Sequence, residues 1–276
     1  MSDKGVLFDD HYLGDIEERV GRDTAIARYE GAKVVGVYCA FTPKELIAAA
    51  GAIPVALCSG SDIPIQLAEQ HLPRNLCALI KSSYGHAIAE SCPYFQATNF
   101  LLADATCDGK KKMFELLGRV KPLTMLQLPQ TAATPESFTY WLQELYRIKK
   151  LLEQQMAVVI TEERLWQQIR IYNRLRSKIC EVFALNKGDT PLAFGREIDA
   201  ITSMAGFECN LDTRIDEMQE AIDRIHQRAD DPAGDKAIFS GPRILLTGCP
   251  TTNKKVMHLI EDSGGLVVAM ENCGNN

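Results

Sequence analysis

The cysteines are the residues of this sequence with the most specific chemistry. Nine are present, and five fall within 69 residues, each beside Gly, Pro or other turn-forming residues: Cys39, Cys58, Cys77, Cys92 and Cys107. The other four are Cys180, Cys209, Cys249 and Cys273. A cysteine can pack as a small apolar group, form a disulfide or bind a metal. Each of these roles predicts a different protein.

Disulfides are the first role that the sequence argues against. The N-terminus, MSDKGVLFDDHYLGDIEERV, is polar and charged, without the apolar segment and small-residue cleavage site of a secretory signal. No apolar run approaches the ~18 residues of a membrane span. We therefore expect a cytoplasmic protein with no membrane span, in a compartment that keeps thiols reduced. The odd number of cysteines would also leave one unpaired.

The spacing of the cysteines indicates which metal they could bind. Thiolate-rich, carboxylate-poor ligation selects iron–sulfur clusters or zinc. Structural zinc usually depends on tight Cys-x2–4-Cys pairs, whereas the first five cysteines follow one another at intervals of 19, 19, 15 and 15 residues. Single cysteines on separate loops favour a cluster held between strand ends. A zinc- or thiol-based binding protein stays the alternative, although the five scattered histidines indicate no set of nitrogen ligands.

The charge pattern argues against nucleic acid as a partner. The chain has 276 residues, 24% of them charged, and a net charge of −6. It has no basic stripe of the kind that follows a phosphate backbone. The compact basic run Lys110–Lys112 is expected to be the solvated first turn of a helix, with an anionic substrate as the alternative.

Alternating short strands and helices must position these cysteines in the first half of the chain. Strands are predicted at 34–38 and 53–58, with a helix between them that begins in a capping box formed by Thr42 and Glu45. Short β-α-β units of this kind favour a parallel sheet. Residues 59–98 are predicted to be irregular apart from one helix near 63–70.

The remaining elements complete a prediction of the α/β class. Strands at 99–104 and 123–128 enclose a helix that ends at Gly118, which predicts a doubly wound parallel-sheet lobe. Apolar residues at i, i+3, i+4 spacing then predict a helical block, and a strand-helix-strand pattern after residue 237 predicts the start of a second α/β lobe. The expected domains are 1–132, 133–236 and 237–276.

Several cysteines fall just after predicted strands. Cys39, Cys58, Cys107, Cys249 and Cys273 lie at or shortly after carboxyl ends, which share one edge of a parallel sheet where ligands bind. Cys77 and Cys92 lie in the irregular segment, which must fold over an edge.

Other roles are expected for some of the cysteines. Cys180 and Cys209, in the helical block, are expected to be buried apolar residues, and Cys58 is expected in the core rather than as a ligand. Cys249 could instead shape a helix N-terminus that accepts an anion.

Six separated segments resemble one known family. They are GVYCAFTPKELIAAAGAIPVALCSGSD, LPRNLCALIKSSYGHAIAESCPYF, ADATCDGKKKMFELL, LQLPQT, ILLTGCP and VVAMENCG. Together they resemble the 2-hydroxyacyl-CoA dehydratase D-component family, which includes benzoyl-CoA reductase subunits. The sequence motifs LPRNLC…IKSSYG and TCDGKKK are most similar to those of the double-cubane cluster protein branch. The resemblance extends over essentially the whole chain.

The resemblance implies a fold and a function. The fold would be two flavodoxin-like α/β lobes joined by helices, in a homo- or heterodimer. The cofactor would be an oxygen-sensitive iron–sulfur cluster, either [4Fe-4S] or double-cubane. A separate ATP-hydrolysing iron–sulfur activator would supply one low-potential electron for radical dehydration of a 2-hydroxyacyl-CoA. In the double-cubane branch, a small molecule would be reduced instead.

The family motifs also imply the site residues. Cys77 and Cys107 match cluster-ligand positions, and the further candidate ligands are Cys92, Cys39, Cys249 and Cys273. No catalytic acid or base can be assigned, and Ser82, Ser83 and Tyr84 are candidates for a substrate pocket or for a turn. Family members continue beyond the ENC motif, so the chain is expected to be C-terminally truncated. The alternative function is therefore a non-catalytic or accessory subunit that retains the fold.

Overall fold

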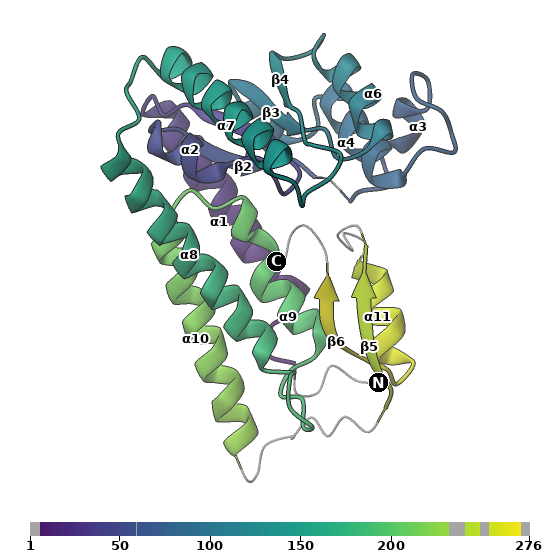
Figure 1. Cartoon of the computed structure of the whole chain (residues 1–276). Helices are drawn as coiled ribbons and strands as arrows, with labels where there is room; N and C mark the ends of the chain where they lie inside the picture. Colours follow the sequence, from purple (N-terminus) through teal and green to yellow (C-terminus); the bar gives the residue numbers. More distant parts are fainter. Residues whose placement is uncertain (1–5, 59, 232–240, 249–253, 272–276) are drawn as a thin grey trace. The chain divides into compact units, whose positions relative to one another are not determined.

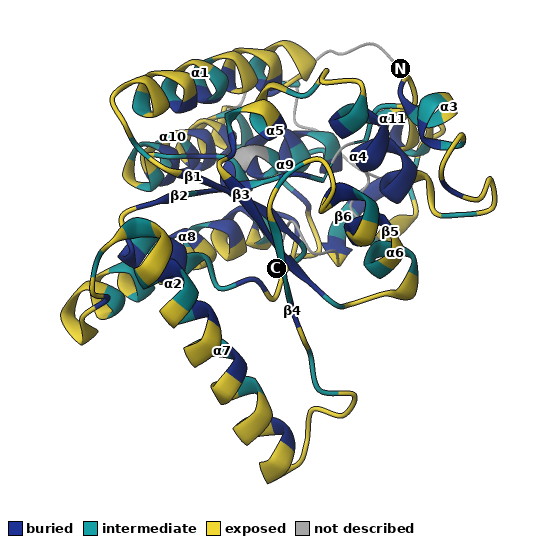
Figure 2. Cartoon of the chain, turned by 90° about the horizontal axis from the view of Figure 1, so that it is seen from above, coloured by how far each residue is buried: buried dark blue, intermediate teal, exposed yellow. Residues whose placement is uncertain are grey.

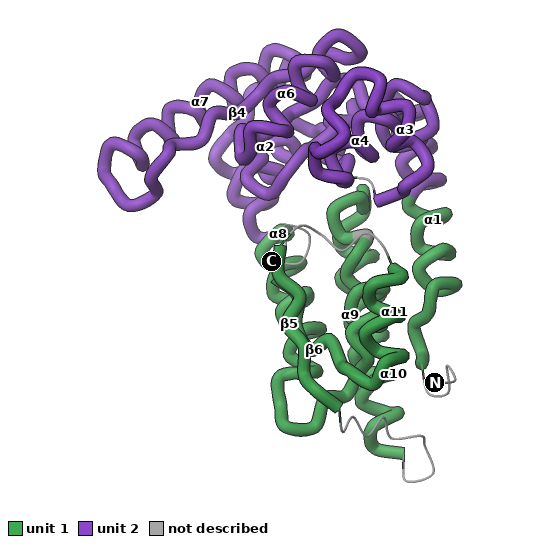
Figure 3. The backbone as a smooth tube through the Cα atoms, turned by 90° about the vertical axis from the view of Figure 1, so that its right-hand side faces the viewer, with its two compact units in different colours: residues 1–20, 171–276 green, residues 21–170 purple. Residues whose placement is uncertain are grey.

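The computed structural model describes residues 6–58, 60–231, 241–248 and 254–271. Contacts divide the chain into two compact units (Figure 3), and each is described by itself. Gly21–Arg170 form the unit that we call the sheet unit, and Met1–Val20 with Ile171–Asn276 form the helical unit. This division differs from the three predicted segments, whose boundaries stay a prediction.

The sheet unit is built on four parallel strands (Figure 1). They are β1 (Val34–Tyr38), β2 (Ile53–Ala56), β3 (Phe100–Asp104) and β4 (Leu123–Leu126), in the order β2-β1-β3-β4. All five residues of β1 and of β3 are buried (Figure 2), as expected for parallel strands covered on both faces. The order is that of the first four strands of a flavodoxin-like sheet. The predicted α/β class is thus confirmed.

Two helices cover one face of this sheet. They are α2 (Lys44–Ala49) and α7 (Pro135–Met156). Val37 and Leu102 of the strands lie in the same buried core as Leu152 of α7. The outer side of α7 is exposed (Figure 2), as its alternating exposed and buried residues require. The sheet therefore presents its odd-numbered β1 side chains to this layer.

Four shorter helices cover the opposite face. They are α3 (Ile65–Ala68), α4 (Ala78–Ile88), α5 (Pro93–Ala97) and α6 (Asp108–Leu117), and their buried residues form one core with Tyr38 at the end of β1. These helices come from the segment between β2 and β4. Both faces are thus covered, which gives the three layers of a doubly wound fold.

The prediction that residues 59–98 are mostly irregular is wrong. The segment holds α3, α4 and α5, and α4 is 11 residues long. Gly85 resembles a helix breaker in the sequence, but it sits where α4 meets the Pro64 backbone. A Cβ at this position would lie 2.2 Å from the Pro64 carbonyl oxygen, so glycine is required by the close approach.

The predicted capping box at Thr42 is also wrong. Helix α2 begins at Lys44, with Pro43 at its N-cap and no side-chain cap. The Thr42 hydroxyl instead donates to the Tyr38 carbonyl at 3.2 Å. The chain leaves β1 through Cys39 in the left-handed conformation, and this turn directs Thr42 back towards the strand.

The helical unit contains helices that the sequence pattern predicted and one that it did not. The predicted ones are α8 (Glu162–Ala184), α9 (Gly195–Thr202) and α10 (Leu211–Asp230), with a short 3-10 helix after α9 at Ser203–Gly206. Helix α1 (Asp10–Tyr29) was not predicted. The boundaries between the two units fall within α1 and α8.

Ion pairs between buried and half-buried side chains hold these helices together. Arg19 of α1 donates to Glu208 at 2.7 Å and to Glu217 of α10 at 3.0 Å, and the fully buried Arg214 also donates to Glu217 at 2.9 Å. The two arginines and two glutamates balance in charge. Pairing of this kind offsets the desolvation cost that each buried charge would carry alone.

The last elements form a two-stranded parallel sheet. Strands β5 (Arg243–Thr247) and β6 (Leu266–Glu271) are joined through α11 (Lys254–Asp262), as predicted. Within the described residues, β5 pairs with β6 alone, and three of its five residues are exposed. Parallel strands are normally buried on both faces, which β5 is not, and its second edge has no partner strand among the residues that the structure describes. None of the helices in the described ranges has both the length and the apolar composition for crossing a membrane.

Candidate functional site

Three of the predicted ligands occupy the same kind of backbone position. Cys77, Cys92 and Cys107 are the N-cap residues of α4, α5 and α6. The Cys92 sulfur accepts the backbone N–H of Phe95, and the Cys107 sulfur that of Lys110, each at 3.4 Å. A helix N-terminus carries unsatisfied N–H groups and a partial positive charge, which favours an anionic thiolate there.

Cys39 lies at the carboxyl end of β1 in an uncommon conformation. Its φ of 73° is in the left-handed region, which costs a residue with a Cβ some strain. The Lys110 ammonium donates a hydrogen bond to the Cys39 sulfur, and the Thr106 hydroxyl does so at 3.6 Å. Lys110 therefore donates to the sulfurs of both Cys39 and Cys107, one through its side chain and one through its backbone.

Asp104 adds a buried acid beside these thiols. It ends β3 and is fully buried, and its Oδ2 atom accepts the Phe41 N–H at 2.9 Å. Its Oδ1 atom has no hydrogen-bond partner in the part of the chain that the structure describes. Burial raises the pKa of this carboxyl group, against the opposing effect of the Phe41 N–H.

Burial also raises the pKa of the Cys39 thiol, to about 11. The hydrogen bond from Lys110 opposes this shift, and the negative charge of Asp104 adds to it. The thiol is therefore protonated at neutral pH when no metal is bound. A metal that binds at Cys39 must displace that proton, because only the thiolate is a good ligand.

The start of α4 lies against the start of α6. A Cβ at Gly109, in the first turn of α6, would lie 2.8 Å from Leu76 Cδ1 and 2.9 Å from Ile80 Cδ1. Cys77 directly follows Leu76, so this contact brings the two N-termini together. Cys77 and Cys107 are both exposed, and Cys39 is half-buried. We infer that these three thiols gather around the N-terminus of α6.

Cys92 lies on the same face of the sheet but packs more deeply. It is half-buried against the core that includes Tyr38, as is Cys58. Burial raises the pKa of Cys92, and it raises that of Tyr38 well above its ordinary value, with Cys58, Cys92 and Cys39 adding to the Tyr38 shift. Cys58, which was expected in the core, therefore packs against the core but is only partly buried.

Within the described residues, no three His, Cys, Asp or Glu side chains are arranged to hold a metal ion. Cys249 and Cys273 lie outside the described residues. The donor chemistry around α6 nevertheless fits a thiolate-bound, negatively charged group, because exposed thiols, helix N-termini and the Lys110 ammonium meet there. The six ligand assignments stay predictions.

The predictions for three side chains are wrong. Cys180 was expected to be buried, but it is exposed, whereas Ile179 and Val182 of the same helix are buried. Cys209 is only half-buried. The prediction of a solvated first turn at Lys110–Lys112 fails for Lys110, which bonds to the Cys39 thiol.

The two neighbours of Lys110 behave as that prediction expected. Lys111 pairs with Asp108 at 3.3 Å and Lys112 with Glu115 at 2.8 Å, both on the outside of α6. Sequence reasoning missed Lys110, Thr106 and Asp104 as neighbours of the thiols. The signal that could have found Asp104 was its place as an acid at the end of an apolar strand.

Ser82, Ser83 and Tyr84 lie within α4 and are buried, so they form neither a turn nor an open pocket. The Ser82 hydroxyl donates to the Ser61 carbonyl at 2.6 Å, and the Tyr84 hydroxyl lies 2.8 Å from His71 Nδ1. These contacts tie α4 to the segment around α3. Their role is structural in the geometry that the structure describes.

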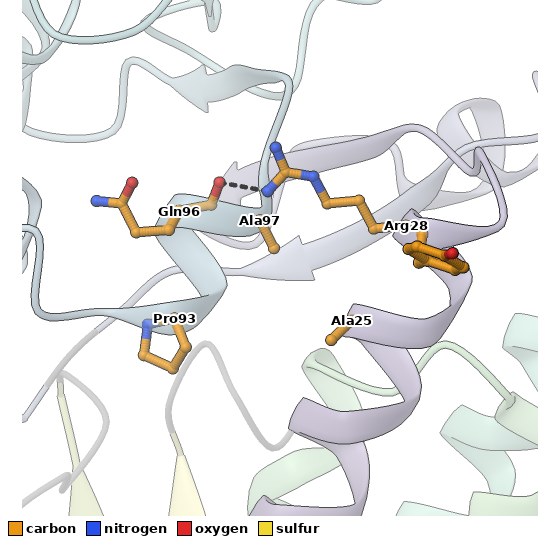
Figure 4. A pocket seen from close by; sticks show the side chains of 6 residues that line it. Ala25, Arg28, Pro93, Gln96 and Ala97 are labelled. Atoms are coloured by element: carbon orange, nitrogen blue, oxygen red, sulfur yellow. Dashed lines mark hydrogen bonds between the residues drawn. The ribbon is translucent and has the colours of Figure 1, made fainter.

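An open pocket lies beside α5 (Figure 4). It is lined by Ala25, Arg28 and Tyr29 of α1 and by Pro93, Gln96 and Ala97 of α5. The Arg28 guanidinium donates to the Gln96 carbonyl at 2.6 Å, which links the two helices. The lining is mainly apolar apart from this pair and provides no convergent set of catalytic groups.

Comparison with known proteins gives a family match over most of the chain. The model named 2-hydroxyglutaryl-CoA dehydratase, D-component, matches residues 39–276. The chain is 38% identical over 245 residues to a protein of Escherichia coli (strain K12) that carries the provisional name dehydratase subunit YjiM, covering 88% of this chain and 63% of that protein.

More distant relatives have related names. The chain is 22% identical over 242 residues to the (R)-phenyllactyl-CoA dehydratase beta subunit of Clostridium sporogenes, covering 86% of this chain and 62% of the relative. It is 22% identical over 157 residues to a benzoyl-CoA reductase subunit of Thauera aromatica, covering 55% and 40%. The chain thus spans less than two thirds of the length of these relatives.

Proposed function

The chain belongs to the 2-hydroxyglutaryl-CoA dehydratase D-component family, and on this basis we propose that it is an iron–sulfur subunit of a dehydratase or reductase. The observation that carries the proposal is that Lys110, in the first turn of α6, donates hydrogen bonds to the sulfurs of both Cys39 and Cys107. The bound group would be [4Fe-4S] or double-cubane. When bound, such a cluster supplies a low-potential one-electron donor.

The residues that would hold the cluster are proposed in two groups. Cys39, Cys77 and Cys107 come first: Lys110 donates to the sulfurs of Cys39 and Cys107, and Cys77 is the N-cap of the neighbouring helix α4. Cys92 is a further ligand that is half-buried in the neighbouring core. Cys249 and Cys273 are proposed from the family motifs.

The surrounding residues have roles that do not depend on the cluster type. The N-termini of α4 and α6 carry unsatisfied N–H groups and a partial positive charge, which suit a negatively charged bound group. Asp104 accepts a hydrogen bond from the Phe41 N–H and thereby stabilises the turn that contains Cys39. The core formed by α3 to α6 covers this face of the sheet and limits the access of water to the inner side of the site.

The partners and substrates are proposed at the level of chemical class. One partner is an ATP-hydrolysing iron–sulfur activator that delivers a single low-potential electron, and another is a second subunit, in a homo- or heterodimer. The substrate is a 2-hydroxyacyl-CoA thioester that loses water, or a small unsaturated molecule that gains electrons. Relatives named as the beta subunit of a dehydratase and as a subunit of benzoyl-CoA reductase support a subunit role.

A second candidate is a non-catalytic or accessory subunit that keeps the fold. It is favoured by one observation: among the described residues, β5 pairs with β6 alone and three of its five residues are exposed. An accessory protein of this kind would hold a cluster without turning over a substrate.

The proposal is tested by anaerobic purification with iron and sulfide analysis, followed by an activity assay with an activator of this family, ATP and a strong reductant. Iron and sulfide in similar amounts, with oxidation of the activator, support the enzyme. Zinc without sulfide would overturn the iron–sulfur assignment. A loaded protein that never oxidises the activator would favour the accessory subunit.

A further inference from the structure

We propose that Lys110 is a positioning residue that raises the reduction potential of the cluster by donating to the sulfurs of two of its ligands. This inference rests on the proposed function, since it assumes that Cys39 and Cys107 bind a cluster. It assigns a role to one lysine of a run of three. The other two serve as internal controls.

The geometry of Lys110 is the first step of the argument. Its backbone N–H donates to the Cys107 sulfur at 3.4 Å, and its ammonium group donates to the Cys39 sulfur. The two cysteines come from different parts of the sheet edge, one after β1 and the other after β3. A single residue therefore links two thiols that are 68 positions apart in the sequence.

The second step is that its neighbours point elsewhere. Lys111 pairs with Asp108 at 3.3 Å, and Lys112 pairs with Glu115 at 2.8 Å. Helical geometry separates successive residues by about 100°, so only one lysine of the run can face the sheet edge. Lys110 and Lys111 are both half-buried and Lys112 is exposed, so the contact with the sulfurs, and not burial alone, distinguishes Lys110, whose partial burial strengthens the field of its charge there.

The third step is electrostatic. One-electron reduction adds a negative charge to a thiolate-bound cluster, and hydrogen bonds and positive charge at the sulfurs stabilise the more negative state. Lys110 supplies an N–H group and a full charge. Asp104 lies close enough to interact with Lys110 and offsets part of its effect. Removal of the ammonium should therefore lower the reduction potential.

The experiment compares wild type with Lys110→Met, Lys110→Arg and Lys111→Met, each reconstituted anaerobically and analysed for iron and sulfide. A redox titration with titanium(III) citrate, followed by electron paramagnetic resonance, gives the midpoint potential. The reductant loses one electron for each electron that the cluster gains. We expect Lys110→Met to lower the ratio of reduced to oxidised cluster about tenfold at a fixed potential, or ~59 mV for a one-electron couple.

The other variants define the result further. Lys110→Arg should stay near wild type because it keeps a positive donor, and Lys111→Met should match wild type. Equal potentials in wild type and Lys110→Met, at equal iron content, would overturn the inference and leave the proposed function standing. Loss of iron in Lys110→Met alone would also overturn it, since Lys110 would then be needed to hold the cluster. Absence of iron and sulfide from wild type would overturn the proposed function itself.

Discussion

Arg228 of α10 and Glu197 of α9 form a salt bridge at 2.8 Å with almost no solvent contact, since their side chains are 8% and 0% exposed. Glu197 also accepts the backbone N–H groups of Leu7 and Phe194. The pair therefore ties the start of the chain and the start of α9 to α10. Such a pair contrasts with the one between Arg174 and Asp212, which has the same 2.8 Å distance but side chains 57% and 61% exposed.

We predict that Arg228→Met lowers the free energy of unfolding by about 3–5 kcal/mol, because it leaves Glu197 buried without its cation. Arg174→Met should cost less than ~1 kcal/mol, because an exposed pair is screened by water. Urea denaturation of both variants measures the difference. Equal losses of unfolding free energy in the two variants would show that burial does not determine how much each ion pair contributes to stability.

The glycines give a second prediction. Gly85→Ala should destabilise the sheet unit by about 3 kcal/mol or more, because overpacking forces backbone to move, and the new Cβ would meet the Pro64 carbonyl oxygen at 2.2 Å. Gly14→Ala, within α1, meets nothing within 4 Å and should stabilise the chain by about 0.5–1 kcal/mol through helix propensity. Thermal denaturation distinguishes the two. A tolerated Gly85→Ala would contradict the close contact between α3 and α4.

Cys39 gives a prediction in which two substitutions differ in their effect on stability but both lower the metal content. Glycine adopts the φ of 73° found at this position without strain. Apoprotein with Cys39→Gly should therefore be about 1 kcal/mol more stable than apoprotein with Cys39→Ala. Both should bind less iron than wild type after reconstitution. Wild-type iron in either variant would remove Cys39 from the proposed ligands.

The other ligands are tested by serine substitutions. Cys77→Ser and Cys107→Ser should each lower the iron bound per chain, since serine suits an N-cap position but lacks the soft sulfur donor. Cys180→Ser is the matched control, because Cys180 is exposed on α8 and distant in sequence from the site. Inductively coupled plasma analysis measures the iron. Equal iron in all three variants would refute the assignment.

Asp199 predicts a dependence of stability on pH. Burial raises its pKa from 3.8 to about 6, with Asp10 adding to the shift and Ser203 and Lys254 opposing it. Between these values the folded chain binds more protons than the unfolded chain, so this group makes stability fall as the pH rises through that window.

Asp199→Asn should therefore match wild type below pH ~4 and exceed its stability by about 1–2 kcal/mol above pH ~6, less than the ~3 kcal/mol of a full two-unit shift because the side chain keeps some solvent contact. Melting temperatures measured across this pH range test the prediction. A constant difference at every pH would show that the carboxyl group titrates normally.

Most of the fold could be predicted because hydrophobic patterns are local. The strand at Val34–Tyr38 matches its predicted bounds, and β2, β3 and β4 end or begin within two residues of theirs. Helix α4 was missed because its Ser, Gly and Lys residues look polar and flexible, and only tertiary packing shows that Lys81 to Gly85 are buried. Helix α1 was missed because its apolar positions are sparse.

The site was only partly predictable for a similar reason. The cysteines could be found from residue type and their places after strands. That Cys77, Cys92 and Cys107 are N-caps depends on helix starts, which the sequence pattern placed inexactly. The role of Lys110 depends on which lysine of three faces Cys39, and this follows from the rotation of α6 about its axis. No local pattern determines that rotation.

The open edge of β5 also affects how readily the purified protein aggregates in solution. A strand edge with unpaired N–H and C=O groups can recruit strands from other molecules, and β5 pairs with β6 alone among the described residues. Leu245, 58% exposed on this strand, adds an apolar contact. We therefore expect the isolated chain to aggregate faster as its concentration rises. Dilute samples and co-expression with a partner subunit should be the starting conditions for every measurement above.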